Sequence, residues 1–123
     1  MAKKKILLVD DSRTALLMEQ MILRQTAHQT ILASDGAEAV DKALAEKPDL
    51  ILMDVMMPRL GGFEAVRELR RREDTRSIPV IMVTTRGEAE NVEAGFESGC
   101  NDYLTKPIDS GALLAKVREF LGE

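Results

Sequence analysis

Short apolar runs alternate with amphipathic stretches along the chain, and this alternation is the strongest constraint on its fold. The runs occupy residues 6–9, 30–33, 50–53, 80–83 and, more weakly, 103–105. Alternating strands and helices form a parallel sheet covered by helices, and continuous apolar character indicates strands that are buried on both faces. The sequence therefore predicts an α/β fold with five strands and five helices.

The intervening stretches carry apolar residues three or four positions apart, the spacing of one helix face. In chain order these stripes are Ala15, Met18 and Ile22; Ala37, Val40 and Leu44; Phe63, Val66 and Leu69; Ala89, Val92 and Phe96; and Leu113, Val117 and Phe120. We expect Met18 and Met21 to fill the core. Candidate caps are Ser12, Asp35 and Asp109 at helix starts and Gly99 after the fourth helix.

Length, charge and composition exclude several classes of protein. A chain of 123 residues predicts a single domain spanning 1–123, and a lone Cys100 cannot form an intramolecular disulfide. No apolar run approaches the length of a membrane span. A net charge of −4 and no Trp disfavour direct nucleic-acid binding. We therefore expect a cytoplasmic protein without a nucleic-acid or membrane partner.

An arginine-rich stretch near the middle of the chain has a simpler interpretation than a phosphate-binding patch. Acidic residues are interleaved with it, so it is interpreted as the solvated end of the third helix. The arginines are Arg67, Arg70, Arg71, Arg72 and Arg76. Cys100 is interpreted as a packed, inert thiol.

Polar residues follow most of the predicted strands. Asp10 and Asp11 end the first run, Asp54 the third and Thr84 the fourth, while Lys106 follows the fifth. In open parallel sheets, ligands bind beyond the carboxyl ends of the strands. If the first and third strands are neighbours, three carboxylates converge, and a hard divalent cation such as Mg²⁺ suits them. Taken singly, the residues also fit plainer roles, with Asp11 or Ser12 as a helix cap and Thr84 as a structural strand residue.

Taken in order, six segments of the chain resemble the receiver domains of two-component response regulators, particularly the small stand-alone chemotaxis type. The segments are 6–12, 33–36, 48–54, 57–58, 79–84 and 103–108, whose sequences read ILLVDDS, ASDG, PDLILMD, MP, PVIMVT and YLTKPI. The resemblance covers nearly the whole chain. It implies the flavodoxin-like, doubly wound strand order 2-1-3-4-5. We expect a single receiver domain over residues 1–123, with no effector domain.

The same resemblance assigns roles to the polar residues at the strand ends. Asp54 would accept a phosphoryl group from the phosphohistidine of a histidine kinase or phosphotransfer protein. Mg²⁺ would be held by Asp10, Asp11, Asp54 and the backbone carbonyl of Met56. Lys106 would pair first with Asp54 and then with the phosphoryl oxygens.

The resemblance further implies a switch that controls binding of a downstream protein. The hydroxyl of Thr84 would donate to the phosphoryl group, and Tyr103 would move with it. The output face would comprise the fourth helix, fifth strand and fifth helix, and the Lys106–Pro107 bond would be cis. Met56, Thr85 and Arg86 lie where side chains flank the path of an attacking water, so we expect Met56 and Thr85 to lengthen the phosphorylated lifetime.

Two alternatives compete with a phosphorylation-controlled module. One is a receiver-like adaptor that works without phosphorylation, against which the full set of pocket residues argues. The other is a Mg²⁺-dependent phosphatase, although Met56 stands where such enzymes place a second Asp. We expect self-phosphorylation and slow self-dephosphorylation at Asp54 rather than turnover catalysis. A monomer is expected, with pairing through the fourth and fifth helices as an option after phosphorylation.

Overall fold

The computed structural model describes residues 3–57, 59–85 and 96–122. The strands are β1 (Lys5–Val9), β2 (Gln29–Ala33), β3 (Leu50–Asp54), β4 (Val80–Thr85) and β5 (Asp102–Lys106). The helices are α1 (Arg13–Leu23), α2 (Gly36–Glu46), α3 (Gly62–Arg71) and α5 (Ser110–Leu121). Residues 96–98 are also helical. The predicted fourth-helix positions Ala89 and Val92 lie outside the described residues.

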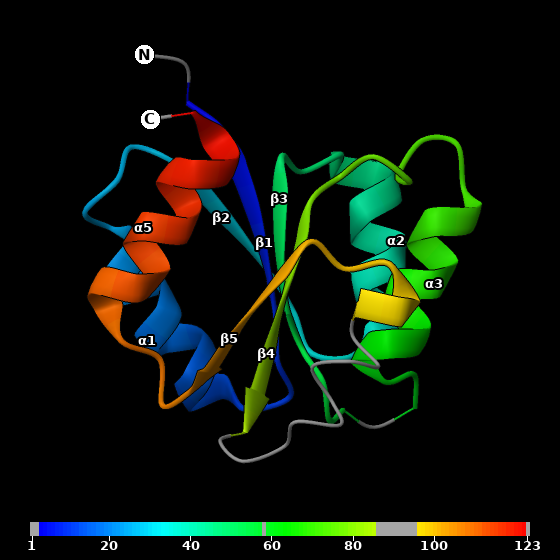
Figure 1. The fold of residues 1–123 in the computed structure, drawn as a ribbon, viewed down its shortest axis with the longest axis horizontal. Coiled ribbons are helices and arrows are strands. Elements are labelled where there is room, and N and C mark those ends of the chain that lie inside the picture. Colours follow the sequence, from blue (N-terminus) through cyan, green and yellow to red (C-terminus); the bar gives the residue numbers. More distant parts are fainter. Residues whose placement is uncertain (1–2, 58, 86–95, 123) are drawn as a thin grey trace.

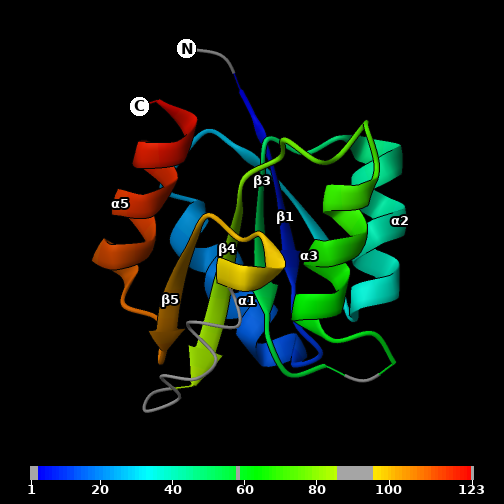
Figure 2. The same cartoon turned by 45° about the vertical axis from the view of Figure 1, so that its right-hand side comes forward.

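All five strands pair in parallel in the order β2-β1-β3-β4-β5, which confirms the predicted doubly wound topology. Helices α1 and α5 cover one face of the sheet, and α2 and α3 cover the other (Figure 1). Since every strand runs the same way, their carboxyl ends meet at one edge, which lies at the bottom of Figures 1 and 2. This edge is where the predicted polar residues gather.

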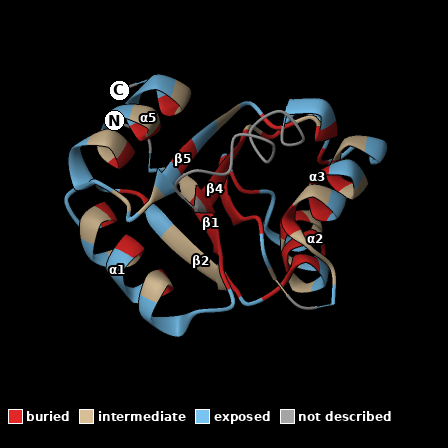
Figure 3. Cartoon of the chain, turned by 60° about the horizontal axis from the view of Figure 1, so that its bottom comes forward, coloured by how far each residue is buried: buried red, intermediate tan, exposed pale blue. Residues whose placement is uncertain are grey.

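The strand side chains alternate between two apolar cores, as the pleat of a strand requires. In β1, Leu7 and Val9 face α2 and α3, whereas Ile6 and Leu8 face α1 and α5. Every residue of β3 is buried, which matches its continuous apolar run. Figure 3 shows the buried central strands of the sheet flanked by helices whose outer faces are exposed. None of the described helices is long and apolar enough to cross a membrane.

The three predicted N-caps are confirmed. Ser12, Asp35 and Asp109 each accept a hydrogen bond from the backbone N–H three residues later, at 3.2, 2.8 and 2.9 Å respectively. Each bond satisfies one of the amides that a helix start leaves without an intrahelical partner. Gly99 has a φ of 109°, the positive value expected after a helix.

The predicted core face of α1 is wrong by one position. The helix buries Leu16, Glu19 and Leu23, whereas the predicted core residues Met18 and Met21 are 55% and 64% exposed. Apolar residues occur nearly all round α1, so periodicity alone does not select the arc that faces the sheet. The buried arc includes a carboxylate, which becomes important below.

Arg70 is not part of a solvated cluster as predicted. Its guanidinium donates to the carbonyls of Gly99 and Ile78, at 2.9 and 2.8 Å, and to Oδ1 of Asn101 at 2.9 Å. Burial lowers the pKa of this group. Arg70 therefore joins the end of α3 to the segments that flank β4 and β5, where several carbonyls would otherwise lack donors.

Candidate functional site

The carboxyl ends of the strands bring the predicted acidic residues together. Asp10 follows β1 and Asp54 ends β3, and the pairing of these strands places Val9 opposite Met53. One carboxylate oxygen from each of Asp10, Asp11 and Asp54 lies within 4.8 Å of the other two. Asp10 and Asp54 are buried, and Asp11 is exposed. The result is a three-carboxylate cluster that opens to solvent on one side.

Lys106 supplies the positive charge of this cluster. Its Nζ lies 3.0 Å from Oδ2 of Asp10 and 3.3 Å from Oδ1 of Asp54. Burial acts to lower the pKa of Lys106, but the hydrogen bond to Asp10 and the two carboxylate charges together raise it. Lys106 thus remains protonated and bridges the ends of three strands.

The carboxyl group of Asp54 binds protons more readily than an ordinary aspartate. Burial, followed by repulsion from Asp10, raises its pKa to about 6, although Lys106 acts in the opposite direction. The positive charge of Lys106 does not balance the summed negative charge of the three converging carboxylates. The site therefore favours a further cation, which would lower the pKa of Asp54.

The donor set fits Mg²⁺. This ion prefers oxygen ligands, uses one or two carboxylates and keeps other positions for water or phosphate oxygens. Asp10 and Asp54 offer buried carboxylates, and Asp11 offers an exposed one. The predicted ligand set of Asp10, Asp11 and Asp54 is therefore brought together. The fourth predicted ligand, the carbonyl of Met56, lies in the loop directly after β3.

Thr84 has a buried hydroxyl with no hydrogen-bond partner among the described residues. It lies on β4, next to the end of β3, where Asp54 pairs with Val83. A buried polar atom without a partner is costly and requires an explanation. A ligand oxygen bound at Asp54 during function would supply the missing acceptor.

Two close backbone approaches fix the loop between β3 and α3. The N–H of Gly62 donates to the carbonyl of Val55 at 3.0 Å, and that of Gly36 donates to the carbonyl of Leu60 at 3.0 Å. A Cβ at Gly62 would lie 2.2 Å from the carbonyl oxygen of Asp54, and one at Gly36 would lie 2.2 Å from that of Leu60. Only glycine allows these approaches, so both glycines position the loop that carries Met56.

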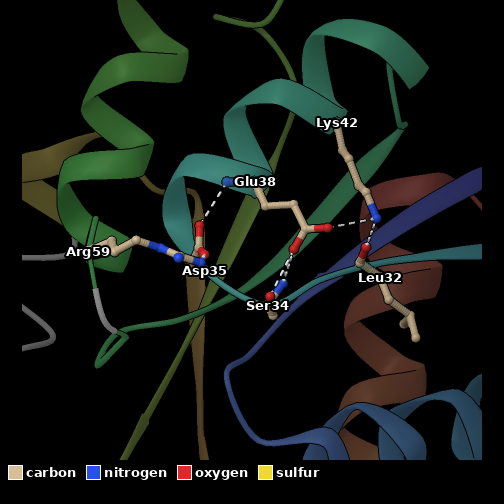
Figure 4. A network of polar contacts seen from close by, with 6 residues as sticks. All are labelled: Leu32, Ser34, Asp35, Glu38, Lys42 and Arg59. Atoms are coloured by element: carbon tan, nitrogen blue, oxygen red, sulfur yellow. Dashed lines mark hydrogen bonds and ion pairs between the residues drawn. The ribbon is translucent and has the colours of Figure 1, made fainter.

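An ion pair adds to this anchoring (Figure 4). The guanidinium of Arg59, which has a positive φ of 65°, binds the buried carboxylate of Asp35. The N–H of Glu38 and then Arg59 lower the pKa of Asp35. Glu38 in turn accepts hydrogen bonds from Ser34 and pairs with Lys42 at 3.0 Å. This network joins the loop to the start of α2.

Two predicted switch and lifetime residues, and the predicted cis bond, lie within the described part of the chain. The side chain of Met56 is 71% exposed at the edge of the site. Tyr103 is 37% exposed, and its ring meets that of Phe96 edge-on at a centroid distance of 6.0 Å. The Lys106–Pro107 bond, for which the resemblance implies cis geometry, is cis. The side chain of Thr85 and all of Arg86 lie outside the described part of the chain.

Glu19 is a site residue that sequence reasoning missed. This α1 carboxyl is 3% exposed, and its Oε1 has no hydrogen-bond partner among the described residues. Burial, followed by repulsion from Asp10, raises its pKa to about 8. The available signal was its spacing, because Glu19 lies three residues after Leu16 and four before Leu23, the two apolar residues of the buried arc.

Comparison with known proteins agrees with this geometry. The model of the response regulator receiver domain family matches residues 6–118. Protein PilH of Pseudomonas aeruginosa is 42% identical over 117 residues, which cover 95% of this chain and 97% of PilH. The chain spans about half the length of other curated relatives, which are transcriptional regulators.

Solved structures share the fold over nearly the whole chain. One such structure is the receiver domain of a Pseudomonas aeruginosa sensor histidine kinase, with magnesium coordinated in its active-site cleft. It is 34% identical to this chain with a TM-score of 0.91, and the match covers 99% of this chain and all of the other. The receiver domain of Saccharomyces cerevisiae Ssk1, in complex with the histidine phosphotransfer protein Ypd1, is matched at 30% identity, a TM-score of 0.87 and coverage of 96% and 88%. This chain belongs to the response regulator receiver domain family of two-component signalling proteins.

Proposed function

We propose that Asp54 accepts a phosphoryl group from a phosphohistidine on a histidine kinase or a histidine phosphotransfer protein. The observation that carries this proposal is the position of Asp54, whose carboxylate lies within 4.8 Å of two others and 3.3 Å from Lys106. A carboxylate oxygen of Asp54 attacks phosphorus, a P–O bond forms, and the P–N bond to the histidine breaks. The leaving imidazole keeps the electron pair of that bond and takes up a proton.

The surrounding residues stabilise the charge that develops in this transfer. Phosphoryl transfer depends mainly on positioning and on electrostatic stabilisation. Lys106 is placed to exchange its bond with Asp54 for bonds to phosphoryl oxygens, and Thr84 holds a hydroxyl that no described residue binds. Mg²⁺, when held by Asp10, Asp11, Asp54 and the carbonyl of Met56, would neutralise charge on the transferred group. Complexes of receiver domains with phosphotransfer proteins, such as Ssk1 with Ypd1, support this class of partner.

The proposed output is a change in protein binding at the face made by the fourth helix, β5 and α5. When the Thr84 hydroxyl turns to the phosphoryl group, the end of β4 moves and Tyr103 repacks against its neighbours. The edge-on contact between the rings of Tyr103 and Phe96 offers a way to detect this movement. Aromatic side-chain signals of both residues should shift in NMR spectra when beryllofluoride binds. Unchanged signals would mean that Tyr103 takes no part in the switch.

We propose further that the domain is not a turnover enzyme. Met56 offers no group that could act as a general acid two residues after Asp54. Hydrolysis of the acyl phosphate should therefore be slow, and it should not speed up with added phosphodonor. Rapid multiple turnover of a phosphate ester with Mg²⁺ would instead favour a phosphatase.

The decisive test is phosphorylation by acetyl phosphate, followed by intact-protein mass. We expect one labile adduct that requires both Mg²⁺ and Asp54, so it should be absent with EDTA and in Asp54→Asn. The matched control Asp41→Asn removes an exposed carboxylate on α2 and should be phosphorylated normally. An adduct on Asp54→Asn would move the acceptor to another residue. Failure of both phosphorylation and beryllofluoride binding would favour the phosphorylation-independent adaptor.

A further inference from the structure

A cavity lies next to the acidic cluster, between α1 and the segment that follows β5. Its volume is about 410 Å³, and most of its lining is apolar. The apolar lining residues are Ala15, Met18 and Ile22 of α1, together with Pro107 and Ile108. Cavities of this size with apolar walls and a few polar groups are typical of small-molecule sites.

Among the described residues, two polar side chains line this cavity, and only one of them has its hydrogen-bonding partners within the protein. Lys106 is occupied, because its Nζ is bound by Asp10 and Asp54. Glu19 is 3% exposed, and its Oε1 has no partner in the described part of the chain. Such an atom loses the hydrogen bonds it had in water and gains none. The cavity thus offers one buried acceptor that a bound molecule could satisfy.

The surrounding charges select the kind of donor. When Glu19 is ionised, no cation among the described residues forms an ion pair with it, because Lys106 is held by Asp10 and Asp54. An anionic ligand would be repelled. A neutral donor would satisfy the hydrogen bond but leave the charge, whereas an ammonium would do both.

We propose that this cavity binds a small primary amine with an apolar body. The ammonium group donates to the carboxylate of Glu19, and the hydrocarbon portion packs against Met18 and Ile108. Charge-assisted hydrogen bonds are stronger than neutral ones, so the amine is preferred over an alcohol of the same shape. Binding requires neither Mg²⁺ nor a phosphodonor, so it can succeed or fail independently of the proposed phosphoryl transfer.

The test is an NMR titration of isotope-labelled protein in EDTA at pH 8, with 2-phenylethylamine as the probe. Two comparison compounds test the two parts of the probe separately. 2-Phenylethanol has the same apolar body without the charge, and methylamine has the charge without the apolar body. We expect saturable shifts in α1 and in residues 106–108. The affinity for 2-phenylethylamine should exceed that for either comparison compound by about tenfold or more.

Variants then test the assigned contact. Glu19→Gln keeps the shape of the side chain but removes its charge, so it should weaken binding of the amine about tenfold and leave 2-phenylethanol unchanged. Glu119→Gln, on the exposed face of α5, is the matched control and should change neither. Ala15→Leu narrows the cavity from α1 without altering charge, and it should weaken both ligands.

Several results would overturn the proposal. They are an absence of saturable binding, equal affinities for the amine and the alcohol, and an amine affinity that Glu19→Gln leaves unchanged. Shifts confined to residues 10, 11 and 54 would also overturn it, since they would place the amine in the acidic cluster instead.

Discussion

Replacement of Glu19 by Gln should stabilise the metal-free protein at pH 8 and have a much smaller effect at pH 5. The pKa of Glu19 rises from an ordinary value of 4.5 to about 8 in the folded protein. Because folding raises the pKa of Glu19, the protein keeps the full contribution of this group to its stability below pH 4.5. That contribution is lost as the pH rises from 4.5 through about 8, because the unfolded chain releases the proton more readily than the folded protein does. A glutamine side chain does not titrate in this range, so the variant would avoid this loss.

The magnitude follows from the two pKa values of Glu19. Each pH unit between them corresponds to about 1.4 kcal/mol, so the total penalty above pH 8 is about 5 kcal/mol. Between pH 5 and pH 8 the stability difference between Glu19→Gln and wild type should therefore grow by about 3 to 4 kcal/mol. This is a large fraction of the 5–15 kcal/mol by which domains are typically stable.

Urea denaturation in EDTA at pH 5, 6, 7 and 8 measures this difference directly. Other titrating groups are present in both proteins, so most of their contribution cancels in the comparison. Glu119→Gln, which removes an exposed carboxylate of α5, is the control for the loss of a side-chain charge. A difference between Glu19→Gln and wild type that stays constant from pH 5 to pH 8 would refute the reasoning. It would mean that ionisation of Glu19 does not lower the free energy of unfolding.

Four further variants test other parts of the structure. Met56→Asn and Thr85→Ala should each speed loss of the phosphoryl group by admitting water; unchanged dephosphorylation rates in a phosphate-release assay would remove both residues from lifetime control. Arg59→Gly tolerates the positive φ but breaks the ion pair with Asp35, so it should weaken Mg²⁺ binding several-fold in calorimetry. An unaltered Mg²⁺ affinity would mean that backbone contacts alone hold the loop. Arg70→Met removes three charged hydrogen bonds and should lower the free energy of unfolding by about 2 to 3 kcal/mol, and a loss under about 0.5 kcal/mol in urea would contradict its structural role.

The strands and the acidic site were predictable because their signals are local. Each strand is an uninterrupted apolar run, and all five lie within one residue of the predicted start and two residues of the predicted end. Asp10, Asp54 and Lys106 end their strands or follow them, so parallel pairing alone brings them together. The strand order, however, rested on family resemblance, because no local feature of the sequence determines which strands are neighbours.

The errors arose where tertiary contacts decide the outcome. Arg70 lies in a charged stretch typical of solvated residues, yet it donates to the carbonyls of Ile78 and Gly99, which follow it by 8 and 29 residues in the chain. Charge patterning considers only neighbours in sequence and cannot register such contacts.

Glu19 shows the same limit in the opposite direction, because a charged residue on a helix is normally assigned to the solvent side. On α1 the apolar residues surround the helix, so that assignment left Met18 and Met21 as the expected core. The packing of α1 on the sheet and α5 instead turns Glu19 inward, next to Asp10, where its burial is costly. A carboxyl buried at such a cost is more naturally a functional group than a packing residue, since an apolar side chain of similar size would be more stable there. The same feature that defeated prediction from the sequence is thus what directs attention to the neighbouring cavity.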